Sequence, residues 1–253
     1  MQKFSSDGVE IAFEVWGQGP AILLIHGFAS NAQVNWVNTG WVKTLTAAGQ
    51  QVIAMDNRGH GQSEKLYTVD QYQAPMMADD AKRLLDHLAV PKAAVMGYSM
   101  GARISAFLTM QHPEKVACAV FAGMASHMVT GVGGSDAIAA ALEAPSAAKV
   151  ENREARAFRL FADSTKSDRA ALAACIRSSR VKIKEDALRA INCPVLVVAG
   201  ELDDIAGQIE PLVKMLPHAR GVVLPKRNHM NAVGDSVYKA AVLEFLSEHD
   251  DLW

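Results

Sequence analysis

The sequence predicts an α/β fold, namely a doubly wound, mostly parallel sheet flanked by helices, with a helical cap inserted late in the sheet. One observation is a series of short apolar runs, none of which alternates polar with apolar residues. Such runs are typical of parallel strands that are buried on both faces. A second observation is that longer amphipathic stretches separate the runs, as crossover helices do in this fold class. The runs are Ile22–Ile25, Val52–Met55, Ala93–Met96, Val116–Phe121, Val195–Ala199 and Val222–Leu224.

The stretches between the runs have the period of helices. Ala78–Leu88 and Val233–Leu246 each place apolar residues on one helical face. Ahead of the first run, Asp7-Gly8 separates two β-prone segments, Lys3–Ser6 and Val9–Trp16. A turn of this type between β-prone segments is typical of an antiparallel hairpin. We therefore expect an antiparallel edge on the parallel sheet.

One long interval contains no strand-like run. Between Gly123 and Asn192 the pattern is helical and rich in alanine. An insertion of this length between two strands is expected to form a cap, and the alternative is that its helices only stabilise the sheet edge. We predict a core domain from residues 1–123 and 192–253 and a cap from residues 124–191. The expected cap helices are Asp136–Leu142, Glu151–Asp163, Asp168–Ser178 and Glu185–Ala190.

The composition excludes several classes of protein. Of 253 residues, 50% are hydrophobic and 21% are charged, which rules out intrinsic disorder. The 25 Lys and Arg residues balance 27 Asp and Glu residues, and no block of like charges occurs. The sequence therefore lacks the basic patch that nucleic acid or anionic lipid would require. The longest apolar stretch, Val116–Ala125, is too short to cross a membrane.

The three cysteines predict no disulfide framework. Cys118, Cys175 and Cys193 are odd in number and show no C-x-x-C spacing, so a zinc site is not expected either. A reducing cytoplasm is the expected compartment. No ligand spacing for a metal or an organic cofactor is present, and we expect none.

The chemistry begins at Gly97-Tyr98-Ser99-Met100-Gly101, which follows a predicted strand and opens a predicted helix. The pattern G-x-S-x-G in this context is typical of a nucleophile elbow. Such a tight turn holds Ser99 in a strained conformation, and the flanking glycines avoid side-chain clashes. The helix N-terminus beneath the hydroxyl favours developing negative charge. The alternative is that Ser99 only caps the helix.

A serine nucleophile needs a base, and the base needs an orienting carboxylate. His229 lies between the last predicted strand and the final helix, at the same sheet edge as the elbow, and is predicted to be the base. The acid is expected in the loop after Val195–Ala199. Asp203 is preferred there, with Asp204 and Glu201 as alternatives. The resulting order is Ser, Asp, His.

An oxyanion hole needs two backbone N–H groups near the nucleophile. We predict that the amides of Met100 and Phe28 supply them, since Gly27 lets the loop after the first parallel strand turn sharply. His26 in that loop is expected to order it by hydrogen bonding, and the alternative is a second general base.

Together these motifs resemble the α/β-hydrolase superfamily, in particular its lipase- and esterase-like serine hydrolases, over essentially the whole chain. The similar segments are the oxyanion loop His26-Gly27-Phe28, the D-x-R-G-x-G-x-S segment Asp56–Ser63, the elbow Gly97–Gly101, the acid loop Gly200–Asp203 and the terminal His229.

The resemblance implies that Asp56 and Arg58 brace loops around the site. Two positions depart from the family pattern. Asp204 stands where members often have proline after the acid, and Asn228 stands where they often have glycine before the histidine. A second carboxylate beside the acid puts the identity of the acid and the pH optimum in question.

The predicted reaction is hydrolysis of a small-to-medium carboxylic ester through an acyl-enzyme intermediate. A cofactor-free C–C bond hydrolase is the enzymatic alternative, and a non-catalytic ligand-binding protein is the alternative of another class. A serine at the elbow argues against haloalkane dehalogenases and epoxide hydrolases, whose members place aspartate there. The expected partner is a small-molecule ester, with the chain as a monomer or homodimer.

The predicted pocket is compact and apolar. Tyr98 and Trp36 are the predicted substrate-binding residues, with Trp41 as an alternative to Trp36 and Phe28 on the same wall. Only a few of the apolar cap residues are expected to face the nucleophile. Those residues are Met124, Met128, Leu142, Phe158, Leu160, Phe161 and Ile176.

Overall fold

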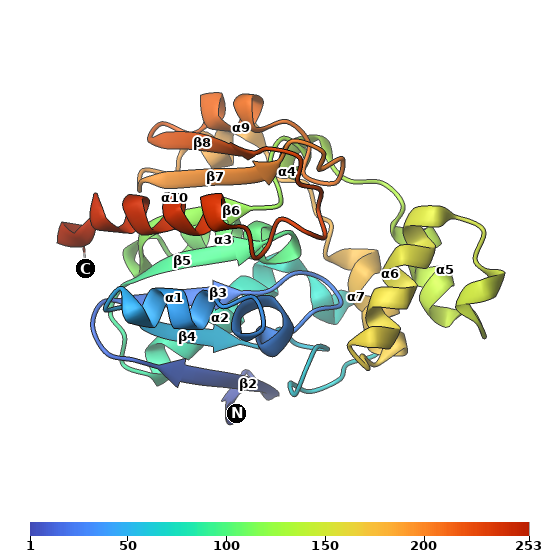
Figure 1. The fold of residues 1–253 in the computed structure, drawn as a ribbon. Coiled ribbons are helices and arrows are strands. Elements are labelled where there is room, and N and C mark those ends of the chain that lie inside the picture. The colour runs from blue at the N-terminus through green and yellow to red at the C-terminus, as the bar shows by residue number, and fades with distance from the viewer. Residues whose placement is uncertain (253) are drawn as a thin grey trace.

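The computed structural model describes residues 1–252 and contains one eight-stranded sheet with the strand order β1-β2-β4-β3-β5-β6-β7-β8 (Figure 1). The hairpin of β1 and β2 is antiparallel, and β2 pairs antiparallel with β4. All other neighbours are parallel. The predicted fold class is confirmed. The strands are β1 (Gln2–Ser6), β2 (Val9–Trp16), β3 (Ala21–Ile25), β4 (Gln51–Met55), β5 (Ala93–Tyr98), β6 (Val116–Ala122), β7 (Val195–Gly200) and β8 (Ala219–Leu224).

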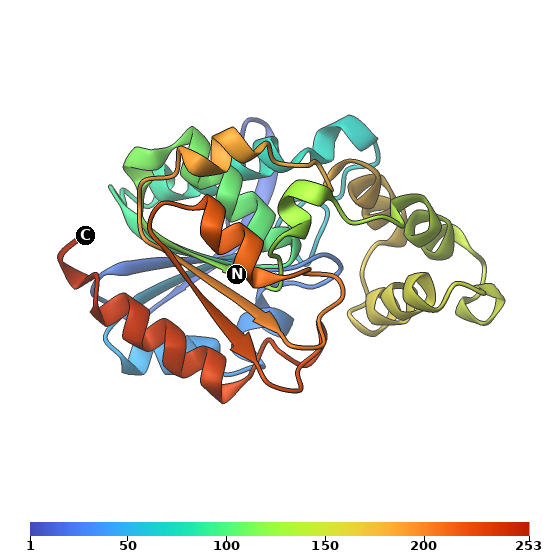
Figure 2. The ribbon, with the colours of Figure 1, turned by 90° about the horizontal axis from the view of Figure 1, so that it is seen from above.

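Helices cover both faces of the sheet, which gives three layers (Figure 2). One face is covered by α1 (Trp41–Ala47) and α10 (Ser236–Ser247), which contact each other. The other face is covered by α2 (Ala74–His87), α3 (Met100–Gln111) and α9 (Ile209–Met215). Short 3₁₀ or π turns occur at Gln33–Val37, Val69–Tyr72, Pro113–Lys115, Ala147–Lys149 and Asp250–Leu252.

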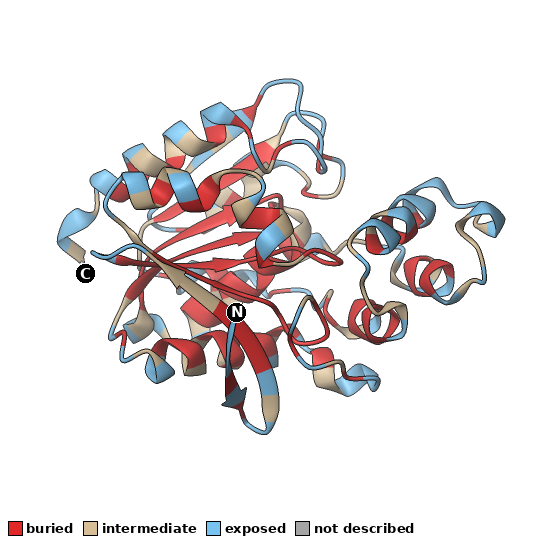
Figure 3. Ribbon diagram, turned by 60° about the horizontal axis from the view of Figure 1, so that its bottom comes forward, coloured by how far each residue is buried: buried red, intermediate tan, exposed pale blue. Residues whose placement is uncertain are grey.

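Alternate side chains of the central strands enter two separate hydrophobic cores. Ile22 and Leu24 of β3 belong to the core beneath α1 and α10. Leu23 and Ile25 belong to the core beneath α2 and α3. All four are fully buried, as the continuous apolar runs predict, and Figure 3 shows the strands as buried between the helices.

The run Val222–Leu224 departs from this expectation. Its strand, β8, is an edge strand, and Val223 is 54% exposed. The prediction of burial on both faces is wrong here, because the helices leave part of one face of this edge strand uncovered.

The chain between β6 and β7 forms five helices. Three of them, α5, α6 and α7, lie together beyond the carboxyl ends of the strands (Figures 1 and 2). The other two pack on the core: α8 contacts α3 and α9, and the amides of Ala125 and Ser126 before α4 donate to the carbonyls of Ala206 and Gln208. The predicted cap range therefore includes two short helices that contact the core. The helices are α4 (His127–Thr130), α5 (Ser135–Glu143), α6 (Arg153–Ser164), α7 (Arg169–Ser178) and α8 (Glu185–Arg189).

Side-chain caps determine where two of these helices begin. The Asn152 side chain accepts a hydrogen bond from the Ala155 amide, so α6 begins at Arg153. The Asp168 side chain accepts from the amides of Ala170 and Ala171 at the start of α7. Each cap satisfies backbone donors that have no partner within the helix. Throughout residues 1–252, no helix is both long and apolar enough to cross a membrane.

Candidate active site

The predicted triad residues meet at the carboxyl ends of the central strands, where the order of the sheet reverses. The chain passes from β3 to β4 on one side of β3 and returns to β5 on its other side. Crevices at such reversals are the usual ligand sites of open α/β sheets. Here the loop after β3 lies against the elbow, since a Cβ on Gly27 would lie 3.4 Å from the Ser99 Cβ.

The turn that carries Ser99 is strained in the expected way. Ser99 has φ 57° and ψ −113°, and its amide donates to the Ala122 carbonyl at 2.7 Å. A Cβ on Gly97 would collide with the Gly101 carbonyl, and a Cβ on Gly101 would collide with the Ile25 carbonyl. Helix α3 therefore begins so close to β3 and β5 that only glycine fits at both positions.

Three side chains form a continuous hydrogen-bonded chain. The Ser99 Oγ lies 2.9 Å from His229 Nε2, and both carboxylate oxygens of Asp203 lie 2.9 Å from His229 Nδ1. Asp203 is 6% exposed and His229 is 8% exposed. The Asp203 carboxylate also accepts the amides of Ile205 and Ala206, which fixes its orientation. This arrangement is the geometry of a Ser–His–Asp triad.

The two alternative acids lie elsewhere. Glu201 is exposed, and its carboxylate accepts the Lys226 amide. Asp204 is also exposed. The carboxylate that binds His229 Nδ1 is that of Asp203, and Asp204 forms no hydrogen bond with this histidine. Asn228, the second departure from the family pattern, uses its side chain to accept the amides of Met230 and Asn231, which shapes the turn around His229.

Two backbone N–H groups beside Ser99 have no acceptor. Neither the Phe28 amide nor the Met100 amide donates a hydrogen bond to any group within residues 1–252. The loop of Phe28 is strained at Ala29, which has φ 60°. The loop is held in this shape by the Gly27 amide, which donates to Asn35 Oδ1 at 3.1 Å. Free donors on both sides of a hydroxyl are what an oxyanion hole requires.

His26 is held as a neutral group inside this loop. Its Nε2 accepts the Asn57 amide at 3.0 Å, so its Nδ1 carries the proton and donates to the Gly27 carbonyl at 2.7 Å. Burial lowers the pKa of His26 to about 4. Burial and the neighbouring His26 lower the pKa of His60 to about 3. Since both ring nitrogens of His26 are engaged, its geometry fits ordering of the loop and leaves no free nitrogen for a general base.

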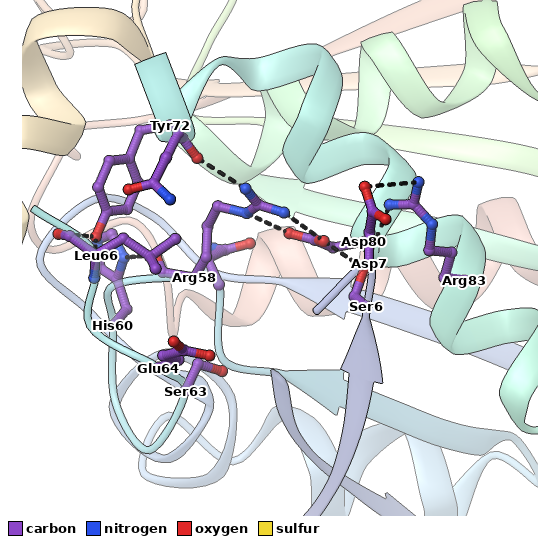
Figure 4. Close-up of polar contacts among 12 residues, drawn as sticks. Ser6, Asp7, Arg58, His60, Ser63, Glu64, Leu66, Tyr72, Asp80 and Arg83 are labelled. Atoms are coloured by element: carbon purple, nitrogen blue, oxygen red, sulfur yellow. Dashed lines mark hydrogen bonds and ion pairs between the residues drawn. The ribbon is translucent and has the colours of Figure 1, made fainter. Parts of the chain in front are cut away.

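Asp56 and Arg58 brace the surrounding loops. The two Asp56 oxygens accept the amides of Ala32 and Gln62, both at 2.8 Å, which ties the loop after β3 to the loop after β4. Arg58 forms a buried two-point ion pair with Asp80 of α2 at 2.7 and 2.8 Å (Figure 4). These contacts are those that the resemblance implies for the two residues.

A cavity of about 220 Å³ opens onto the Ser99 hydroxyl. Phe158 and Phe161 of α6 face it from the cap, whereas Leu160 between them is 51% exposed and points away. Met128 and Leu142 are buried in the core. Met124 and Ile176 line a smaller adjoining cavity that also reaches Ser99, so four of the seven apolar cap residues border the space next to the nucleophile. The apolar part of the wall of the larger cavity consists of Phe28, Val34, Phe158, Phe161, Met230 and Val233.

The prediction that Trp36 contacts substrate is wrong. Trp36 is fully buried and packs against Trp41, which meets the Tyr238 ring edge to face in the core beneath α1 and α10. The π turn at Gln33–Val37 directs Val34 toward the cavity and Trp36 toward this core. Trp41 is equally buried, so neither tryptophan reaches the cavity.

Tyr98 does line the cavity, and its substrate-binding role stays a prediction. Its hydroxyl donates to the His229 carbonyl at 2.6 Å, so it also positions the histidine. Sequence reasoning missed Asn35, which fixes the Gly27 amide. A polar residue in a loop without a motif gives no signal of such a role.

Among the described residues, no group of three or more His, Cys, Asp and Glu side chains could hold a metal ion. The arrangement instead provides a serine hydroxyl, a hydrogen-bonded imidazole with its carboxylate, and two free amides. These parts define a candidate site for nucleophilic catalysis at a carbonyl group.

Known proteins share this fold and sequence pattern. A family model described as the alpha/beta hydrolase fold matches residues 20–133. An uncharacterized hydrolase, YraK, from Bacillus subtilis is 36% identical over 109 residues, which are 43% of this chain and 39% of that protein. The 2-(acetamidomethylene)succinate hydrolase of Mesorhizobium japonicum is 29% identical over 258 residues, or 91% of this chain and 89% of that protein.

A solved structure, the enol-lactonase from Burkholderia xenovorans, superimposes with a TM-score of 0.81 at 20% identity, over 97% of this chain and 100% of that one. The chain therefore has the α/β-hydrolase fold. The match spans well under half the length of the Bacillus relative. The similarity therefore does not identify the reaction that this chain catalyses.

Replacing the nucleophile tests the central assignment. Ser99→Ala is expected to reduce ester hydrolysis by more than a thousandfold, because triad residues together supply a factor of about 10⁶. The melting temperature should stay near that of the wild type, since the hydroxyl is part-exposed and packs no core. Steady-state kinetics and thermal denaturation measure both. Residual activity above about one thousandth of the wild-type rate would mean that another group is the nucleophile.

The two neighbouring carboxylates form a matched pair of variants. Asp203→Asn is expected to lower turnover by roughly 10³–10⁴, because an amide at this place favours the wrong imidazole tautomer. Asp204→Asn removes a charge from an exposed position and should chiefly shift the pH profile. Turnover rates of both variants, measured from pH 5 to 9, show which carboxylate is the acid of the triad. Equal losses, or a larger loss at Asp204, would overturn the assignment of the acid.

The buried histidines make the fold sensitive to acid. The folded-state pKa of His26, about 4, lies below its unfolded value of about 6.5. Between these pH values the unfolded chain binds a proton that the folded chain does not, so stability is complete above pH 6.5 and falls as the pH drops toward 4. For His26 alone the loss is about 3 kcal/mol, and His60 acts in the same direction.

Urea denaturation of wild type, His60→Asn and the exposed-site control His218→Gln at pH 7.5 and 4.5 measures this effect. The loss of unfolding free energy between the two pH values should be smaller in His60→Asn than in the other two proteins. An equal loss in all three would show that His60 does not contribute.

Proposed function

We propose that this protein is a serine hydrolase that cleaves a small-to-medium carboxylic ester through an acyl-enzyme. The observation that carries the proposal is the hydrogen-bonded chain from Asp203 through His229 to Ser99, which ends in a cavity of about 220 Å³. This volume lies below the range of about 300–1,000 Å³ that is common for pockets of drug-sized ligands.

The reaction follows from the positions of these groups. His229 Nε2 takes the proton of the Ser99 hydroxyl while the oxygen attacks the acyl carbonyl. The amides of Phe28 and Met100 stabilise the negative charge that develops on the carbonyl oxygen. His229 then protonates the leaving alcohol, and water repeats the sequence on the acyl-enzyme. The Asp203 carboxylate holds the imidazole in one tautomer and stabilises its protonated form. These steps need no metal or organic cofactor.

Serine at the elbow separates this proposal from other reactions of the superfamily. Epoxide hydrolases are among the relatives of this chain, as the 28% identical rat bifunctional epoxide hydrolase 2 shows over 110 residues. Epoxide hydrolases are expected to carry aspartate where this chain has Ser99. Cleavage of a C–C bond next to a carbonyl group is the alternative, because the same three side chains would serve both reactions.

The size of the cavity predicts a preference for short acyl groups. We expect kcat/KM to be highest for acetyl to hexanoyl p-nitrophenyl esters and to fall steeply beyond octanoyl, without a rate increase where substrate aggregates. Kinetics with the C2 to C16 esters, run beside a β-diketone substrate, measure the preference and test the C–C alternative. A maximum at C12 or above would contradict the size argument. Turnover of the diketone alone would favour C–C cleavage, and no turnover at all would favour a binding protein.

A pair of cap variants tests which side chains set the limit. Phe161→Ala should move the optimum toward longer chains, because Phe161 faces the cavity. Leu160→Ala on the same helix should leave it unchanged, since Leu160 is exposed.

A further inference from the structure

A second, smaller cavity adjoins the reactive serine, and two arginines line it. Its volume is about 20 Å³, enough for one water-sized group. Ser99, Phe28 and Phe158 line both cavities, so the two meet at the nucleophile. Arg103 and Arg180 line only the smaller one, which we call the arginine subsite.

Arg103 carries a buried charge without a counter-ion. It extends from α3 and is 1% exposed. Its guanidinium donates to the backbone carbonyls of His127, Met128 and Val181 and contacts the Met124 sulfur, all of which are neutral groups. Burial lowers the pKa of Arg103 to about 10, so the guanidinium is still protonated at neutral pH.

Arg180 brings a second positive charge to the same place. It lies in the loop after α7, is half-buried, and its guanidinium is 5.9 Å from the centre of the Phe158 ring. It donates to the Gly133 carbonyl and forms no salt bridge with any described residue. The exposed Glu154 is the acidic group that acts on it, from beyond salt-bridge distance.

A third polar group lines the subsite. Ser179 is 1% exposed, and its hydroxyl has no hydrogen-bond partner apart from a weak interaction with the Cys175 thiol. A buried hydroxyl without a good partner destabilises the fold, and so do two guanidinium groups that share a small cavity without a counter-ion. A bound anion would satisfy all three groups at once.

We propose that the arginine subsite recognises a carboxylate carried by the substrate, within a few bonds of the carbonyl that Ser99 attacks. The inference rests on the proposed esterase function and names its substrate class, which is short esters that bear a carboxylate. Arg180 and Ser179 contact the carboxylate, and Arg103 adds its charge from behind. The subsite as it stands is smaller than a carboxylate, so Arg180 must turn away from Gly133. Its half-exposed position in a loop permits that movement.

Matched charged and neutral substrates test the proposal. We would compare kcat/KM for monoethyl succinate with ethyl pentanoate, which places the charge on the acyl side. Butanoyloxyacetate against propyl butanoate places it on the alcohol side. At least one charged ester should be preferred about tenfold to a hundredfold, the effect expected of charge-assisted hydrogen bonds. Release of acid, followed by titration, measures all four substrates without a chromophore.

Variants of the arginine subsite test whether it causes the preference for charged esters. R180Q should abolish it, so that kcat/KM of the charged and the neutral ester of each pair differs by less than about threefold, and S179A should weaken it. R180K should retain part of it, since lysine keeps the charge but loses the planar fork. R156Q removes a charge from an exposed position of α6 and is the matched control. Equal rates on charged and neutral esters, or a preference that survives in R180Q, would overturn the proposal.

Binding to the inactive protein separates this inference from the proposed function. Calorimetry with succinate and glutarate on the Ser99→Ala protein requires no turnover. Binding that R156Q preserves and R180Q removes supports the subsite even if no ester is hydrolysed. Absence of binding, with neutral esters still hydrolysed, would refute the subsite and leave the esterase proposal intact.

Discussion

The start of helix α3 touches the ends of β3 and β5 so closely that side chains are excluded there. Cβ atoms on Gly97 and Gly101 would overlap backbone carbonyls of the elbow and of β3, so this contact exists only with glycine. The approach brings the Met100 amide, the Ser99 hydroxyl and the loop of Phe28 together without any long side chain between them. A displacement of α3 by the width of one methyl group would separate the two amides from the hydroxyl that they flank.

The base is held by contacts that come from three strands. Tyr98, at the end of β5, donates to the His229 carbonyl, and Asp203, after β7, binds the imidazole. The turn after β8 is closed by the side chain of Asn228. Gly123, after β6, has φ +63° and lies against the Tyr98 ring, where a Cβ would collide with it. Because the loops after neighbouring parallel strands share one edge of the sheet, residues far apart in sequence form a single rigid unit.

The sequence revealed those features that follow a simple rule. Buried parallel strands read as continuous apolar runs, and Ser99, Asp203 and His229 stand in motifs with fixed places in this topology. Features that depend on tertiary packing could not be predicted from the sequence. Trp36 lies within a π turn that directs it into the core, and Val223 of β8 is exposed because the helices leave part of one face of this edge strand uncovered. Arg103 and Arg180 stand in ordinary helical and loop sequence, where a charge is normally solvated, so only the structure shows that they share a cavity.

The site gathers features that each reduce stability. Ala29 and Ser99 have positive φ values, His26 and His60 are buried and neutral, and Arg103 is buried without a counter-ion. The contacts that offset them lie one layer further out, in the Asp56 bridge between two loops and the ion pair of Arg58 with Asp80. These braces join the loops to α2 and leave the cavity free of acidic side chains. A positive subsite persists beside the nucleophile because no acidic side chain lines either cavity. Asp56 and Asp80 are engaged by amides and by Arg58, Asp203 is bound to His229, and Glu154 acts on Arg180 only from beyond salt-bridge distance.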